Sequence, residues 1–95
     1  MVQQIVWTQK ALQEHDAIVS YLFEHFGQRI VFKFSMDLKE KLVLIRSHPQ
    51  LYVVTNSRKN IRKTVVNKRL VIFYRHSIRK RKIEIISLWD TRRNK

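Results

Sequence analysis

The sequence predicts a single α+β domain in two layers, with the order β-α-α-β-β-β and a helical hairpin packed on a small, largely antiparallel sheet. Two observations predict this fold class. Apolar residues recur at spacings of three and four over most of the first half, which indicates amphipathic helices, and the second half alternates with a period of two in short runs. A chain of 95 residues has no room for a second core, so we expect one domain over residues 1–95.

The first half is predicted to hold one short strand and two helices. Gln3–Trp7 is β-prone and leads into Thr8, a favourable N-cap for the first helix. Gly27, the only glycine, stands where that helix would end. A second helix fits Gln28–Ser47 and stops before Pro49. Because almost no linker separates the helices, they are predicted to form an antiparallel hairpin.

The second half is predicted to be a loop followed by a three-stranded meander. Residues 49–60 read as a loop with a short extended piece at Tyr52–Val54. Ile61–Val66, Arg69–His76 and Lys82–Trp89 are rich in β-branched and aromatic residues, and short turns join them.

The last strand carries large apolar residues on both of its sides. Strict alternation predicts that one face of this strand carries Glu84, Ile86, Leu88 and Asp90. The opposite face then carries Ile83, Ile85, Ser87 and Trp89. Two helices cover only one face of a small sheet, so some apolar surface ringed by Lys and Arg is predicted to stay exposed, as is typical of protein-binding surfaces. The alternative is that the N-terminal strand or the C-terminal tail folds over it.

The positive charge is concentrated in the second half. The chain has 20 Lys and Arg against 7 Asp and Glu, a formal net charge of +13. Residues 49–95 hold 14 of the 20 basic residues and two of the seven acidic ones, a net of +12. Such a field attracts polyanions and acidic proteins. A merely solubilising surface would not need charge of one sign on one half of the domain.

Composition also excludes several classes of protein. Cysteine is absent, so disulfides and thiolate metal sites are excluded. We find neither a secretory signal nor an apolar run long enough for a transmembrane helix, and we expect a cytoplasmic protein with no membrane association. His15 and His25 are too far apart to share one metal, and His48 reads as loop. We therefore expect no metal and no cofactor.

A series of short motifs follows in order along the chain. They are a β-prone start ending in Trp7, a first helix with Ala11 and Tyr21, a second helix closing on Pro49, then Ile61-Arg62, Leu70-Val71-Ile72-Phe73-Tyr74-Arg75, Ile83-Glu84-Ile85-Ile86 and Asp90-Thr91-Arg92-Arg93-Asn94. Together they resemble the RelE/ParE superfamily of toxins from type II toxin–antitoxin systems, of the plasmid-stabilisation type. The resemblance implies a toxin held in a hetero-oligomer by a cognate acidic antitoxin. Some members of the superfamily cleave mRNA on the ribosome, and others poison DNA gyrase without being enzymes.

The resemblance also suggests site residues for RNA cleavage, which needs a base, an acid and cations around the phosphate. Arg62 and Arg75 resemble the phosphate-facing arginines, and Arg92 and Arg93 resemble the basic pair after the last strand. Many relatives carry a His where Asp90 stands here. His76 is then the best remaining base by its intrinsic pKa. The predicted catalytic set is Arg62, Arg75, His76 and Arg92, and the predicted nucleic-acid-binding set is Lys63, Arg79, Lys82 and Arg93.

Each candidate has a structural alternative. Asp90 could pair with Arg92 or Arg93, Tyr74 is expected to be a core aromatic with its hydroxyl at the rim, and His76 could be a solvated strand-end residue.

Three functions follow from the sequence. The first is a toxin that inhibits translation by ribosome-dependent mRNA cleavage, a metal-independent endoribonuclease. The second is a non-enzymatic gyrase poison of the same fold, favoured by the absent His at position 90. The third is a non-toxic RNA-binding module, which is disfavoured because Phe73 and Tyr74 point to opposite faces of their strand and make no stacking platform.

Overall fold

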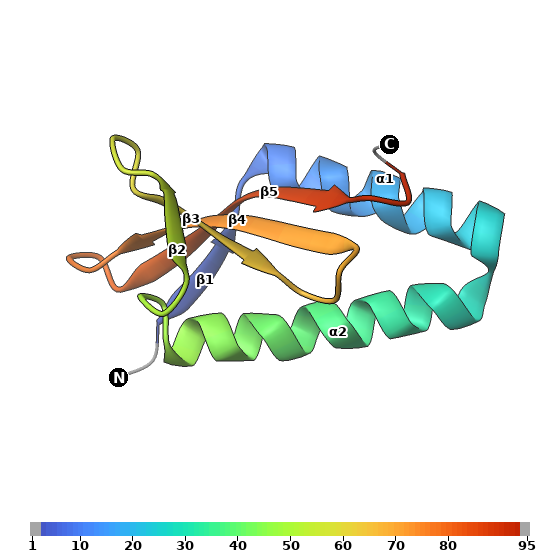
Figure 1. The fold of residues 1–95 in the computed structure, drawn as a ribbon, viewed down its shortest axis with the longest axis horizontal. Helices are drawn as coiled ribbons and strands as arrows, with labels where there is room; N and C mark the ends of the chain where they lie inside the picture. The colour runs from blue at the N-terminus through green and yellow to red at the C-terminus, as the bar shows by residue number, and fades with distance from the viewer. Residues whose placement is uncertain (1–2, 94–95) are drawn as a thin grey trace.

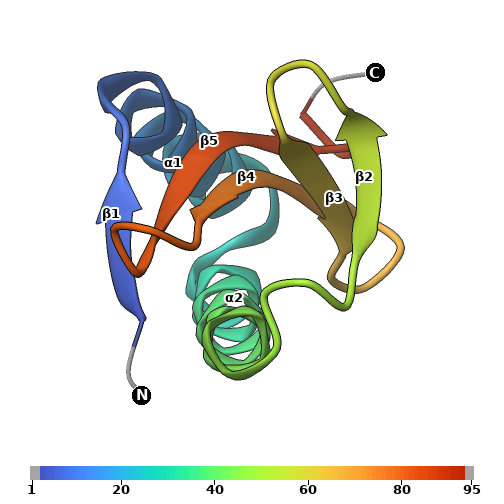
Figure 2. The same cartoon turned by 90° about the vertical axis from the view of Figure 1, so that its left-hand side faces the viewer.

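A computed structural model describes residues 3–93 of the chain as a five-stranded sheet and a helical hairpin (Figure 1). The elements are β1 (Gln4–Trp7), α1 (Gln9–Phe26), α2 (Gln28–Ser47), β2 (Val53–Asn56), β3 (Ile61–Val65), β4 (Leu70–Ser77) and β5 (Lys82–Asp90). The strands lie side by side in the order β1-β5-β4-β3-β2, which Figure 2 shows. The predicted α+β class and the helical hairpin are confirmed.

The sheet has one strand more than the sequence predicts. Residues 49–60 were expected to be mainly loop, but β2 forms within them and pairs antiparallel with β3. All four residues of β2 are exposed, so no buried stripe marks this edge strand in the sequence. At the opposite edge β1 pairs with β5, and this is the only parallel pair among the described strands.

Two capping residues set the bounds of the helices. Thr8 Oγ1 accepts a hydrogen bond from the Ala11 N–H, as an N-cap does, and donates one to the carbonyl of Ile85 on β5. Gly27 alone joins α1 to α2, with φ +87° and ψ −179°. Its N–H donates to the carbonyls of Leu22 and Phe23. This backbone conformation is open mainly to glycine, so the only glycine is placed where the chain must reverse.

The core lies between the helices and one face of the sheet. Its buried apolar residues are Ala11, Ile18, Leu22, Phe34, Leu38, Ile45, Leu70, Ile72, Tyr74, Ile83, Ile85 and Leu88. In β4 the burial alternates strictly, so Val71, Phe73 and Arg75 occupy the other face.

The assignment of the faces of β5 by strict alternation was wrong. Phe73 pairs with Ser87 while Tyr74 pairs with Ile85, so Ile86 is an extra residue in a β-bulge. The bulge shifts the alternation by one residue. Ile83 and Ile85 before it and Leu88 after it therefore all face the helices and are buried.

Apolar surface remains exposed, as predicted. Trp89 on the open face of the sheet is 48% exposed, and Phe32 on the outer side of α2 is 66% exposed. β1 does not cover the open face, because it lies within the sheet beside β5. Over residues 3–93, neither helix is both long and apolar enough to cross a membrane.

Candidate functional site

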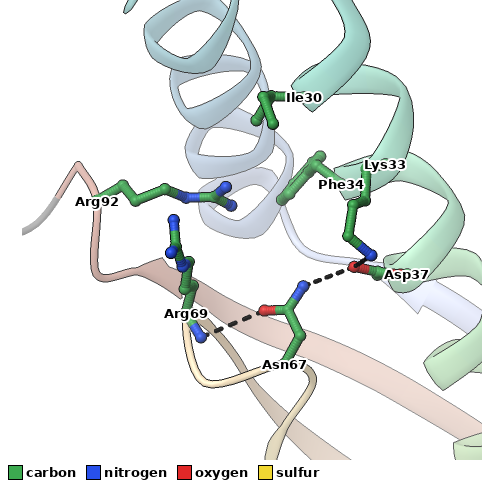
Figure 3. A pocket seen from close by; sticks show the side chains of 7 residues that line it. All are labelled: Ile30, Lys33, Phe34, Asp37, Asn67, Arg69 and Arg92. Atoms are coloured by element: carbon green, nitrogen blue, oxygen red, sulfur yellow. Dashed lines mark hydrogen bonds and ion pairs between the residues drawn. The ribbon is translucent and has the colours of Figure 1, made fainter. Parts of the chain in front are cut away.

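A hollow of about 280 Å³ lies where the start of α2, the β3–β4 turn and the end of β5 meet (Figure 3). Ile30 and Phe34 of α2 give it an apolar floor. Its polar lining residues are Lys33, Asp37, Asn67, Arg69 and Arg92. These come from three separate parts of the chain, and the fold alone brings them together.

Arg92 is held rigidly at one side of the hollow. Its guanidinium donates from Nε to Asp90 Oδ1 (3.0 Å) and from Nη2 to Asp90 Oδ2 (2.8 Å), and its backbone N–H donates to Oδ1 (2.9 Å). Asp90 is fully buried, so the ion pair is screened from water. The two-point geometry fixes the plane of the guanidinium. The predicted pairing of Asp90 with Arg92 is confirmed.

The β3–β4 turn presents Arg69 on the other side. Asn67 Oδ1 accepts hydrogen bonds from the N–H groups of Arg69 and Leu70, and Asn67 Nδ2 donates to Asp37 of α2 (2.6 Å). The N–H of Thr91 donates to the carbonyl of Arg69 (2.7 Å), which ties the end of β5 to the turn. Figure 3 shows the Arg69 and Arg92 side chains pointing toward one another.

The arrangement suits an anion. Asp37 already accepts hydrogen bonds from Asn67 and Lys33, and Asp90 is occupied by Arg92. Within residues 3–93, no carboxylate pairs with the Arg69 guanidinium. Asp90 occupies the Nε–Nη2 edge of Arg92, so the donors that remain for a phosphate or a partner's carboxylate in the hollow are the Arg69 guanidinium and the Nη1 group of Arg92. None of the seven lining residues is a His or Tyr.

A second polar cluster lies at the other end of the sheet. Arg62 Nη1 donates to the carbonyls of Tyr52 (2.7 Å) and Gln50 (3.2 Å). The Tyr74 hydroxyl donates to the carbonyl of Pro49 (2.7 Å). Both side chains therefore anchor the segment between α2 and β2, which is a structural role for each.

Burial shifts the pKa of two titratable groups in this cluster, in opposite directions. Burial raises the pKa of Tyr74 to about 12, against a smaller lowering by Arg62. Burial, and then the Arg62 charge, lower the pKa of His76 below its ordinary value. His76 is 94% buried, being 6% exposed, and no group within residues 3–93 bonds to its Nε2. A neutral His76 has the protonation state of a base, and it lines a hollow of about 490 Å³ beside the segment between α2 and β2, which is not the hollow at Arg69 and Arg92.

The structure does not bring the four predicted catalytic residues together. Arg62 and His76 lie on the helix side of the sheet. Arg75 lies on the open face, where it donates to the carbonyl of Lys59 (2.9 Å) and pairs with Glu84 (3.3 Å). Arg92 is at the far end of β5. The six-residue step along β4 from Leu70, beside Asp90, to His76 corresponds to about 20 Å.

The predicted nucleic-acid-binding residues are also dispersed. Lys63 is exposed on β3, opposite Phe73. Arg79 and Lys82 belong to the β4–β5 turn and its exit, and Arg93 follows β5. Sequence reasoning missed Arg69, because the nearness of the β3–β4 turn to the end of β5 is a property of the folded sheet. The only sequence feature that could have drawn attention to Arg69 is the Asn67-Lys68 turn that precedes it.

Comparison with known proteins places the chain in a family. Residues 5–95 match the family model of the ParE toxin of the type II toxin–antitoxin system parDE. The chain belongs to the ParE toxin family. No curated protein sequence matches it.

Two solved structures share the fold of this ParE-family chain. A chromosomal ParDE toxin–antitoxin system from P. aeruginosa contains a chain that is similar with a TM-score of 0.76 and 18% identity, over 93% of this chain and 95% of that one. The intact E. coli RelBE toxin–antitoxin complex contains one with a TM-score of 0.61 and 16% identity, over the same shares. The resemblance to the RelE/ParE superfamily is thus confirmed. Membership of a toxin–antitoxin family implies an antitoxin partner for this ParE-family toxin.

Proposed function

We propose that this type II toxin acts by binding DNA gyrase and not by cleaving mRNA. One observation carries the proposal: the cationic hollow at Arg69 and Arg92 contains no His or Tyr to move a proton. The buried His76 and the bonded Tyr74 lie toward the other end of β4. RNA cleavage needs a base and an acid beside the phosphate-binding cations, whereas binding to a protein target needs neither.

The character of the exposed surface supports the same proposal. The toxin offers large exposed apolar residues, such as Trp89 and Phe32, together with a net charge of +13. Aromatic anchors surrounded by charge are typical of protein–protein interfaces. The family model that matches is the one for ParE toxins, and the superfamily that the chain resembles includes gyrase poisons.

Ribosome-dependent mRNA cleavage remains the second candidate, because one observation favours it. Arg69, Arg92 and Lys33 surround one hollow, as the cations of a phosphate site would. In that case Lys33 is the nearest group with a transferable proton, although it is engaged with Asp37 at 3.3 Å.

Two assays on the purified toxin separate the candidates. We expect inhibition of gyrase-catalysed supercoiling, with accumulation of cleaved DNA, and no new mRNA 5′ ends in a cell-free translation reaction mapped by primer extension. Arg69→Gln should abolish the gyrase effect, and His76→Gln should retain it at neutral pH. New 5′ ends that appear only while ribosomes translate, with gyrase unaffected, would overturn the proposal in favour of cleavage.

A further inference from the structure

Two turns project from the same end of the sheet, away from the hollow at Arg69. The β2–β3 turn carries Arg58 and Lys59, and the β4–β5 turn with its exit carries Arg79, Lys80, Arg81 and Lys82. Figure 1 shows both turns, yellow-green and orange, at that end of the sheet, and Figure 2 shows them apart, the β2–β3 turn above β3 and the β4–β5 turn on the side of β1. We propose that these basic turns form a binding site for the phosphodiester backbone of a nucleic-acid duplex.

Hydrogen bonds tie the β2–β3 turn to the end of β4, which leads into the β4–β5 turn. Arg75 Nε, on β4, donates to the carbonyl of Lys59 (2.9 Å), and Asn60 Nδ2 donates to the carbonyl of His76 (3.0 Å). The residues that leave the first turn therefore lie against the residues that enter the second. The two turns therefore hold fixed positions relative to each other at this end of the sheet.

Each turn is also fixed internally. Asn56 Oδ1 accepts from the N–H of Lys59 (3.1 Å), and Ser77 Oγ accepts from the N–H of Lys80 (3.3 Å). Asn60 and Arg81 adopt positive φ angles of 56° and 51°, which close the turns. A surface that is ordered before binding loses less entropy when it meets a rigid ligand.

The charge of the basic turns calls for an anionic ligand. Residues 56–60 and 77–82 contain six cations and no carboxylate. The nearest carboxylate along the strand, Glu84, is already paired with Arg75. Five of the six cations are exposed, and Lys82 is half-buried. Like charges this dense repel one another, and the negative charge of phosphate groups relieves that repulsion. The counter-ions that the phosphates release on binding add to the affinity.

The side chains favour a duplex over other polyanions. A single strand is normally held by stacking its bases on aromatic rings, and the basic turns contain no aromatic residue. An acidic protein segment would need apolar anchors, and Ile78 is the one large apolar residue in the turns. Cations on a rigid surface suit a backbone whose phosphates are regularly spaced and whose bases are stacked inside.

The proposed site is independent of the target named above. The β3–β4 turn with Arg69 lies at the opposite end of the strands from the basic turns. A toxin that binds gyrase would meet duplex DNA there, and a toxin that enters the ribosome would meet duplex RNA. Loss of one proposal leaves the other standing.

The test is the salt dependence of duplex binding by the full-length toxin, measured by fluorescence anisotropy with a labelled DNA duplex, the RNA duplex of the same sequence, and the single strand. Six phosphate contacts predict a loss of affinity of about 10³-fold between 50 and 200 mM salt. The variant Arg79→Gln/Lys80→Gln/Arg81→Gln should lose only about 40-fold over that range, because three contacts remain. It should also bind about tenfold or more weakly at low salt.

A matched control removes the same charge elsewhere. Arg29→Gln/Lys39→Gln/Arg46→Gln changes three exposed residues of α2 and should keep the steep salt dependence. Arg58→Gln/Lys59→Gln, in the other turn, should weaken binding as the first variant does. Tighter binding of the DNA duplex or of the RNA duplex shows which of the two nucleic acids the basic turns bind. Equal losses in the α2 control, tighter binding of the single strand, or no duplex binding would overturn the proposal.

Discussion

The guanidinium of Arg92 donates two parallel hydrogen bonds, of 3.0 and 2.8 Å, to the carboxylate of Asp90, which is fully buried. One partner of a buried ion pair is costly to remove, because the other charge is then left without compensation. The pair therefore has a structural role as well as its place beside the hollow. Loss of toxicity on changing Arg92 has to be separated from loss of the fold.

Arg92→Ala is expected to lower the free energy of unfolding by about 3–5 kcal/mol, because it leaves Asp90 buried and unpaired. Asp90→Asn combined with Arg92→Gln removes both charges and should cost clearly less. Urea denaturation of the two variants and the parent checks this. Similar losses in both would show that the pair contributes by its shape and not by its charge.

Arg69→Gln is the cleaner test of the hollow, because the Arg69 side chain is exposed and pairs with no carboxylate in residues 3–93. We expect loss of growth inhibition with a stability change within about 0.5 kcal/mol. Lys68→Gln, one residue earlier in the same turn, is the matched control and should remain toxic. Growth assays after induction, with thermal unfolding of both purified variants, provide the measurement. Toxicity retained in Arg69→Gln would remove the hollow from the mechanism.

Tyr74→Phe should destabilise the fold and spare the toxicity. The variant deletes the hydroxyl that donates to the Pro49 carbonyl, at a cost of about 1–3 kcal/mol. Because the pKa of Tyr74 is raised to about 12 in the fold, the parent loses stability as pH rises above its ordinary value of 10. The variant should lack that part of the alkaline loss. Denaturation across this alkaline range checks the expectation, and loss of toxicity in a folded Tyr74→Phe would make the Tyr74 hydroxyl a candidate for proton transfer.

His76 should make the fold sensitive to mild acid. Its pKa is lowered in the fold, by burial first and by Arg62 second, so the unfolded chain takes up the proton at a higher pH. The stabilisation is complete above the ordinary value of 6.5 and is lost as the pH falls below it. His76→Gln should flatten the curve there. Denaturation midpoints on either side of pH 6.5 measure the effect, and an unchanged slope in the variant would assign the acid sensitivity to other groups.

Gly27→Ala should destabilise the hairpin through the backbone alone. Nothing lies within 4 Å of an added Cβ, but the backbone angles of Gly27 are strained for any other residue. The expected cost is about 1–3 kcal/mol. Gln28→Ala, at the next position, is the control and should change little. Thermal unfolding of both variants decides whether strain at this one position holds the helices in register.

Local rules predicted the helices well because their boundaries are encoded locally. Thr8 begins α1, Gly27 separates α1 from α2, and α2 ends at Ser47 shortly before Pro49. β2 (Val53–Asn56) was predicted only as a short extended piece at Tyr52–Val54, because an edge strand with four exposed residues leaves no alternating pattern. The β-bulge at Ile86 was not predicted, because a single inserted residue cannot be recognised in one strand until the register with its partner strand is known.

The candidate site was predictable only in part, for the same reason. Asp90 and Arg92 are two residues apart, so their pairing could be expected from sequence. Arg69 joins them across β4 and β5, and the Asp37 carboxylate that braces its turn through Asn67 comes from α2, 30 residues earlier. Contacts between distant segments depend on the sheet order, which no local pattern contains.

The parallel pairing of β1 with β5 has a consequence during synthesis. Gln4 pairs with Lys82, so the first strand has no partner until 78 further residues have been made. At a translation rate of about 5–20 residues per second this delay lasts about 4–16 s. Throughout that interval the apolar faces of α1 and α2 have no completed sheet to cover them. The nascent chain is therefore most open to aggregation in this interval, before β5 is made and closes the sheet.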